Sequence, residues 1–221
     1  MSEFRICDGV KWEVSNGQSG IARFSECALA DPRHAFLFDL VRSACADDIV
    51  AMLGETIGNG KFGEVKPVTE APHLVAKLHS EPFTNTALNV CLEAGLRRIA
   101  GGLDLTTPRY IGYVQGFRPL CDPAGYVALT LMSRIEGNNL STFIGPEEDA
   151  KFRESVERQE MIRMSCEAMK SVGINPETAY WPDIHKDNLI ATGNVQTLQE
   201  AYQSPIAVID IPTRAWADSF R

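Results

Sequence analysis

The pattern that most constrains this chain is G-x-G-x-x-G-x-V, which occupies the segment Ile57–Val65. Sequence typical of β-strands lies on both sides of the glycines: one predicted strand runs into the glycines of 58–63, and two more follow at 65–68 and 73–78. Glycines in such a turn let the backbone of a hairpin close over phosphate groups and offer N–H groups with no side chain in the way. A dinucleotide-binding loop would instead need a helix that starts within the glycines. The pattern therefore predicts a strand–loop–strand cover for a nucleotide phosphate.

A cover of this kind needs a cation that reaches the phosphates, and the strand at 73–78 supplies Lys77 between apolar neighbours. A helix predicted over roughly 86–100 by its apolar stripe carries Glu93, which is the expected carboxylate partner of that lysine. Two plainer interpretations stay open. Lys77 could be an edge-strand lysine that points to water, and Glu93 could belong to a solvated helix face.

Asp183 and Asn188 are five residues apart in a loop that leads into an apolar pair, and Asp210 ends an apolar strand. Phosphoryl transfer needs a carboxylate that orients the attacking hydroxyl and oxygen ligands for a magnesium ion. This spacing would put the first two side chains on one side of a tight loop. The alternatives are an Asx-rich turn for the pair and a strand-ending cap for Asp210.

Taken in this order, these elements resemble the protein-kinase-like phosphotransferases. The resemblance implies that Asp183 is the catalytic base, that Lys77 and Glu93 form the phosphate-positioning pair, and that Lys186 is an additional phosphate contact. It implies that Asn188 and Asp210 bind Mg²⁺, for which Mn²⁺ can substitute. ATP would contact the glycine loop and the neighbouring strands, at Ile57, Gly58, Asn59, Gly60, Lys61, Phe62, Gly63, Val65, Ala76, Lys77, Met132, Ser133 and Ile135. In this set Ile57, Val65 and Ala76 would hold the adenine, Met132 would be the gatekeeper, and 133–135 would be the hinge.

The resemblance implies an α+β, protein-kinase-like fold. Its N-lobe, about 54–135, would hold a five-stranded antiparallel sheet with one helix, and its reduced helical C-lobe would span about 136–221. The kinase domain would begin at 51, after a partly helical N-terminal extension, 1–50. In that extension Asp31-Pro32 predicts a helix start, followed by an apolar stripe of Phe36, Leu40, Val41 and Ala44. Strands are also predicted at 109–114 and 126–132, and one long helix over about 146–172.

Several departures from the family pattern narrow the resemblance. Trp181-Pro182 stands where most protein kinases have His-Arg, and Ile211-Pro212 replaces Phe-Gly. His185 occupies a place where aminoglycoside and choline kinases have a histidine. Eleven residues follow Asp210, which leaves no room for an activation segment or for substrate-binding helices. The chain is therefore most similar to the minimal kinases of bacterial type III effectors and bacteriophages.

The expected function is that of a constitutively active Ser/Thr or Tyr protein kinase that uses Mg-ATP. Its substrate would be a protein, and for an effector a host protein such as a chaperone or a component of inflammatory signalling. The alternatives are a small-molecule kinase of the aminoglycoside or choline type, a pseudokinase that acts as a binding module, and a purely structural domain. An effector would be secreted into the host cytosol; otherwise the protein would be cytoplasmic.

The net charge of −8 argues against nucleic acid as a partner, and no apolar run is long enough to span a membrane. The six cysteines are scattered without metal-ligand spacing, so we expect reduced and mostly buried thiols in a reducing compartment.

Overall fold

The computed structural model describes residues 12–60, 63–80, 86–99, 103–121, 125–175 and 184–209, without the side chains of residues 35 and 86–88. These residues form two compact units. The first unit comprises the described residues from 12 to 87 together with 109–134, and the second comprises the described residues of 88–108 and 135–209.

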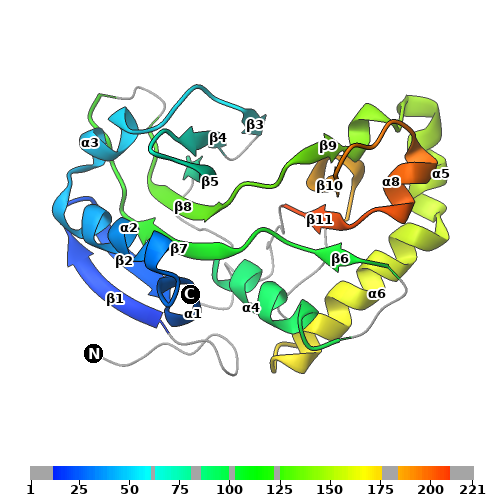
Figure 1. The fold of residues 1–221 in the computed structure, drawn as a ribbon, viewed down its shortest axis with the longest axis horizontal. Helices are drawn as coiled ribbons and strands as arrows, with labels where there is room; N and C mark the ends of the chain where they lie inside the picture. Colours follow the sequence, from blue (N-terminus) through cyan, green and yellow to red (C-terminus); the bar gives the residue numbers. More distant parts are fainter. Residues whose placement is uncertain are drawn as a thin grey trace. The chain divides into compact units, whose positions relative to one another are not determined.

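The first unit is built on a seven-stranded sheet, so the α+β class with a large antiparallel sheet is confirmed but the predicted number of five strands is wrong. Its strands are β1 (Trp12–Gly17), β2 (Gly20–Ser25), β3 (Gly58–Gly60), β4 (Gly63–Val68), β5 (Ala71–His79), β7 (Tyr110–Gln115) and β8 (Ala128–Ser133). They lie in the order β1-β2-β7-β8-β5-β4-β3, and all neighbours are antiparallel (Figure 1).

The two additional strands, β1 and β2, come from the segment that was predicted to be an extension. β2 pairs with β7, and this pairing buries Ala22 and Phe24 completely. The tip of the β1–β2 hairpin is fixed because the Ser19 Oγ donates a hydrogen bond to the Val41 carbonyl at 2.6 Å. A Cβ on Gly17 would lie 2.7 Å from that same carbonyl oxygen, so glycine is required for the close approach. Residues 12–25 are therefore an integral part of the first unit's sheet.

Three helices join this hairpin to the glycine-rich strands: α1 (Glu26–Leu29), α2 (Pro32–Ser43) and α3 (Ala46–Ala51). The predicted start of α2 is confirmed, since the Asp31 carboxylate accepts the Arg33 backbone N–H at 3.0 Å. The predicted apolar stripe is wrong in part, because Phe36 is 42% exposed. Val41 of the predicted stripe is buried, and it follows at helical spacing the buried side chains of His34, Leu37 and Phe38.

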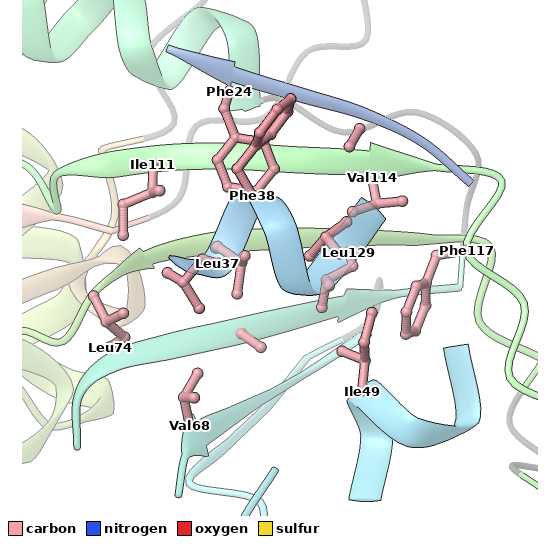
Figure 2. Packing of buried hydrophobic residues seen from close by; sticks show 14 of the residues in the cluster. Phe24, Leu37, Phe38, Ile49, Val68, Leu74, Ile111, Val114, Phe117 and Leu129 are labelled. Carbon is pink, nitrogen blue, oxygen red and sulfur yellow. The ribbon is translucent and has the colours of Figure 1, made fainter. Parts of the chain in front are cut away.

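The core of the first unit lies between these helices and one face of the sheet, as Figure 2 shows. Leu37 of α2 and Ile49 of α3 belong to the same buried cluster as Leu74, Ala76 and Leu78 of β5. Side chains alternate between the two faces of a strand. The intervening residues of β5 therefore point to the opposite face of the sheet, the one that these helices do not cover.

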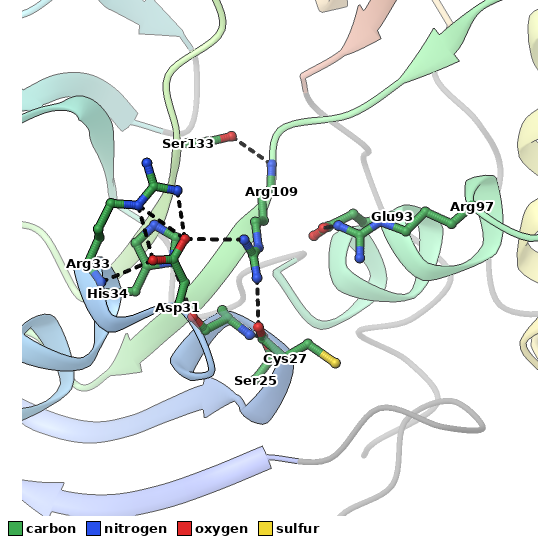
Figure 3. A network of polar contacts seen from close by, with 10 residues as sticks. Ser25, Cys27, Asp31, Arg33, His34, Glu93, Arg97, Arg109 and Ser133 are labelled. Atoms are coloured by element: carbon green, nitrogen blue, oxygen red, sulfur yellow. Dashed lines mark hydrogen bonds and ion pairs between the residues drawn. The ribbon is translucent and has the colours of Figure 1, made fainter.

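A polar network joins the start of α2 to the start of β7 (Figure 3). The Arg33 guanidinium donates to the Asp31 carboxylate, with one N–O distance of 2.7 Å, and Arg109 lies 3.6 Å from the same carboxylate. Arg109 also donates to the Cys27 carbonyl at 2.7 Å. These hydrogen bonds from Arg33 hold the pKa of the Asp31 carboxyl well below its usual range.

Asp31→Asn is expected to lower the melting temperature at pH 7, because the amide keeps the cap but loses the ion pairs. The depressed pKa means that the carboxylate stabilises the fold above its unfolded-state pKa of about 4, and that this contribution is lost as the pH falls below it. The difference between wild type and variant should therefore shrink from pH 7 to pH 3 in thermal unfolding. Asp39→Asn removes an exposed carboxylate of the same helix and is the control. A difference that is equal at both pH values would contradict the prediction.

The second unit has four helices and a four-stranded sheet among its described residues. Its elements are α4 (Thr86–Leu96, from residue 88 on), β6 (Leu105–Thr106), β9 (Gly137–Asn139), η1 (Leu140–Thr142), α5 (Pro146–Glu154), α6 (Val156–Ser171), η2 (Lys186–Asn188), β10 (Leu189–Thr192), α8 (Leu198–Gln203) and β11 (Ile206–Val208). The strand order is β6-β11-β10-β9, in which β6 and β11 are parallel.

The single long helix predicted over 146–172 is wrong, because the chain breaks at Ser155 into α5 and α6. Ser155 is extended (ψ 152°), and its hydroxyl caps α6 by accepting the Arg158 N–H at 3.2 Å. Serine is a favoured N-cap residue, so a new helix begins after Ser155. The apolar periodicity of the sequence continues across this point, but the helical backbone does not. Val156, just after the break, is 80% exposed.

The expectation that all the thiols are reduced and mostly buried is also corrected. Cys91, fully buried in α4, is disulfide-bonded. Cys27, Cys45, Cys121 and Cys166 are reduced, and two of them, Cys27 and Cys121, are exposed. Among the described residues no helix is both long and apolar enough to cross a membrane.

Candidate functional site

The glycine segment forms a β-hairpin, as predicted. Gly58 pairs with Val65 and Gly60 with Gly63, and the Ile57 N–H donates to the Val65 carbonyl at 2.9 Å. The residues after the last glycine continue as β4 and not as a helix, which excludes the geometry of a dinucleotide-binding loop. The tip residues at 61–62, Lys61 and Phe62 of the predicted site, lie outside the described residues.

The three glycines of the hairpin differ in whether the fold requires glycine at their position. Gly63 has φ +144°, and a Cβ there would lie 1.8 Å from the Leu78 carbonyl oxygen, so no other residue fits. A Cβ on Gly60 would meet nothing within 4 Å, and one on Gly58 would meet Val65 only at ordinary contact distance, 3.8 Å. Neither of these two glycines has a positive φ. The fold thus requires glycine at 63, whereas at 58 and 60 it leaves open space beside the backbone.

Lys77 is on an interior strand, since β5 pairs with β4 on one side and with β8 on the other. The interpretation of Lys77 as an edge-strand lysine is therefore excluded. Lys77 is directly opposite Val65 of the glycine hairpin and Thr130 of β8, and opposite residues of antiparallel strands point to the same face. Lys77 is half-buried, on the face that α2 and α3 do not cover.

The predicted adenine contacts divide between the two faces. Ala76 is fully buried in the core cluster, on the face opposite to Lys77, so it does not join the candidate site. Val75 takes its place, because Val75 and its partner Met132 are on the Lys77 face. Val75 and Met132 are 4% and 5% exposed, whereas Ile57 is 53% exposed. The strand alternation counted from Lys77 could have identified Val75 from the sequence.

The end of β8, predicted to be the hinge, is fixed by β7. Ser133 donates its N–H to the Arg109 carbonyl and accepts the Arg109 N–H on its Oγ, both at 2.8 Å. The next residue, Arg134, donates its N–H to the His73 carbonyl at 2.8 Å. Ser133 thus holds the end of β8 through two hydrogen bonds with the Arg109 backbone. Ile135, the last residue of the predicted hinge, is half-buried and belongs to the second unit.

A carboxylate that the sequence did not single out stabilises the hairpin from the other face. Glu64 accepts hydrogen bonds from the hydroxyls of Thr56 and Tyr126, and the Lys66 ammonium lies 3.4 Å from it. The Thr56 and Tyr126 hydrogen bonds lower the pKa of Glu64. Glu64 therefore remains ionised at neutral pH and ties the strand after the glycines to the segment before β8. No motif marks such a contact in advance.

Glu93 lies in the second unit, on α4, with its side chain 12% exposed and in contact with the Arg97 guanidinium. The position of α4 on α6 is set by Gly95, where a Cβ would lie 2.1 Å from the Ala168 carbonyl oxygen. Arg98 adds a hydrogen bond to the Ser171 carbonyl at 2.9 Å. Glu93 is thus held on a helix that packs closely against α6, and the interpretation as a solvated helix face is disfavoured.

The predicted base, Asp183, lies outside the described residues, and the loop that follows it is described from Ile184. In this loop His185 and Asp187 form a contact of 3.5 Å between Nδ1 and Oδ2. The Lys186 ammonium donates to the Ile144 carbonyl at 2.9 Å and lies 3.8 Å from the Asp149 carboxylate. Lys186, predicted to contact phosphate, is thus engaged within its own unit.

The backbone brings the two predicted metal-ligand segments together. Leu189 pairs with Val208, and the Ile209 N–H donates to the Asn188 carbonyl at 3.0 Å. Ile209 directly precedes Asp210, which itself lies outside the described residues. An amide and a carboxylate are oxygen donors of the kind that Mg²⁺ prefers, so this donor pair fits the ion chemically. Within the part of the chain that the structure describes, no group of three or more His, Cys, Asp or Glu side chains is arranged so that it could hold a metal ion.

Comparisons with known proteins add no family assignment. No protein-family model matches the chain, and no curated protein shows a significant match to it.

Proposed function

We propose that the protein is an ATP- and Mg²⁺-dependent phosphotransferase of the protein-kinase-like type that phosphorylates a hydroxyl group of a protein. The observation that carries this proposal is the shared sheet face of the glycine hairpin and Lys77. The hairpin does not require glycine at 58 or 60, because a side chain would fit at both positions. Glycine also loses more conformational entropy on folding than other residues, so these two glycines lower the stability of the hairpin. Close approach of a phosphate to the backbone N–H groups would explain both glycines.

The strand order gives further support. Five of the strands lie in the order β3-β4-β5-β8-β7, and α4 follows β5 in the chain. The kinase-like arrangement predicts this connectivity. The phosphate-binding hairpin (β3 and β4) comes first, then the strand with the lysine (β5), then the helix with the glutamate (α4), and then the two strands β7 and β8, the second of which leads into the hinge. β1 and β2 extend the sheet beyond β7 without changing it.

Each residue of the resemblance has a proposed role in the transfer. In the first unit the glycine hairpin and Lys77 bind the ATP phosphates, while Val65, Val75 and Met132 form the apolar surface for the base. Asp183 accepts the proton of the acceptor hydroxyl, whose oxygen then bonds to the γ-phosphorus. The bond from this phosphorus to the β–γ bridging oxygen breaks, and ADP leaves. Mg²⁺ held by Asn188 and Asp210 would neutralise phosphate charge.

The first test is phosphate transfer from labelled Mg-ATP to proteins of a cell lysate. The wild type should transfer phosphate, and Asp183→Ala should reduce the rate by about 10²–10⁴-fold, because general base catalysis is worth this much. Asp187→Ala is the matched control in the same loop, since Asp187 is 61% exposed. Thermal stabilisation by Mg-ATP without any transfer would contradict the enzyme and favour the alternative of a nucleotide-binding pseudokinase.

A further inference from the structure

We propose that Arg158 and Asn139 are positioning residues that hold the loop 184–188 in the geometry needed for phosphoryl transfer. This inference rests on the proposed function, because the loop directly follows Asp183 and ends at Asn188. Both side chains bind backbone carbonyls of the loop. They can therefore set its path without using the side chains to which we assign chemical roles.

Arg158 contacts the first described residue of the loop. Its Nε donates to the Ile184 carbonyl at 2.7 Å, and its Nη1 donates to the Arg153 carbonyl at 3.1 Å. A guanidinium is planar and presents its N–H groups in a rigid fork, so two contacts fix its orientation. The Ser155 cap places Arg158 in the first turn of α6. The break between α5 and α6 thus creates the geometry that joins the loop to the end of α5.

Asn139 holds the other end of the loop. Its Nδ2 donates to the Asp187 carbonyl at 2.8 Å, and its Oδ1 accepts from the Ser141 N–H at 2.9 Å and from the Ser141 hydroxyl at 2.6 Å. The donor and acceptor sides of the amide are both used, so its orientation follows from the hydrogen bonds. Asn139 also pairs with Ile190 across the β9–β10 ladder, which places it on a rigid element.

Lys186 supplies a third contact to the same loop, through its hydrogen bond to the Ile144 carbonyl. Side chains from α6 and β9, together with this lysine, therefore restrain a loop of five residues at its beginning, middle and end. Catalytic groups must be held to within about 0.5 Å, and residues that support them act by keeping this geometry. We infer that the three contacts serve to preorganise the loop, with Arg158 and Asn139 as its fixed supports.

The test uses the full chain with two variants, each of which removes the side-chain donor of one of the two residues to the loop. Arg158→Met keeps the length and packing of the stem, and Asn139→Asp is isosteric but cannot donate to the Asp187 carbonyl. Arg163→Met is the matched control, since Arg163 is on the same helix and bonds Glu160 and Glu167. Each variant is measured for kcat, for KM of ATP, for folding by circular dichroism, and for hydrogen exchange of the amides at 184–190.

Both variants should lower kcat about 10- to 100-fold, the effect of small misplacements, with KM for ATP within about threefold of wild type. Arg158→Lys should recover part of kcat, and amide exchange at 184–190 should rise in the two variants but not in Arg163→Met. Folded variants with wild-type kcat and wild-type exchange would overturn the inference. If the wild type transfers no phosphate but the amides at 184–190 exchange faster in the two variants, the anchoring of the loop is supported and the proposed function is refuted. If one variant does not fold, the other decides.

Discussion

Lys77→Met is expected to reduce phosphoryl transfer by about 10²–10³-fold while the protein stays folded. Methionine matches the length and much of the volume of the lysine stem, so the interior strand β5 keeps its packing against β4 and β8. What the variant loses is the ammonium on the same face as the glycine hairpin. Losses of this size are typical when one group that stabilises developing charge is removed. Steady-state kinetics with Mg-ATP and thermal unfolding measure the two effects separately.

Lys66→Met is the control for this experiment. Lys66 is on the adjacent strand, opposite Ala76, and therefore on the other face of the sheet, where it lies 3.4 Å from Glu64. Its replacement should leave the transfer rate within about threefold of wild type, because its ammonium is on the face of the sheet opposite to Lys77. Equal losses in both variants, or full activity in Lys77→Met, would refute the role of Lys77.

The second large effect concerns the glycines of the hairpin, which should separate into a structural and a functional member. Gly63→Ala should destabilise the first unit by about 3 kcal/mol, because it combines a positive φ with a Cβ that would lie 1.8 Å from the Leu78 carbonyl oxygen. Such a loss corresponds to a melting temperature lower by about 6–12 °C. Thermal unfolding without nucleotide measures it.

Gly60→Ala is the matched variant of the same hairpin and should behave in the opposite way. A Cβ there meets nothing within 4 Å, so stability without nucleotide should stay the same or rise slightly. Mg-ATP binding should weaken about tenfold, since a methyl group between backbone and phosphate costs a charge-assisted hydrogen bond of about 1.5 kcal/mol. Unchanged ATP affinity in Gly60→Ala would remove the main support for a phosphate-binding loop.

Local features were readable from the sequence because their causes are local. The glycine hairpin follows from residues within one turn of chain, and the start of α2 follows from Asp31 and the proline after it. The place of Val75 on the same sheet face as Lys77 could also have been derived from the sequence, by counting strand alternation from Lys77.

Features that depend on contacts between residues far apart in the chain could not be predicted from the sequence. The strands β1 and β2 alternate only weakly, and Ala22 and Phe24 of β2 are buried in a sheet where β2 pairs with β7, far along the chain. The break at Ser155 interrupts a helical pattern that continues on both sides of it. The contacts of Arg158 and Asn139 with the loop 184–188 have no motif, because each joins residues that come together only in the folded second unit.

Residue types and their spacing are sufficient to predict an α+β chain with a glycine hairpin, a lysine on an apolar strand, and, in a fixed order, a candidate base and candidate metal ligands. They are sufficient because hairpins, caps and short loops form from neighbours. The folded chain was needed to show that Lys77 is on an interior strand, that the fold requires glycine at 63 but not at 60, and that the Lys186 ammonium bonds within its own unit. Those features depend on which surfaces pack together, and packing is a property of the whole fold.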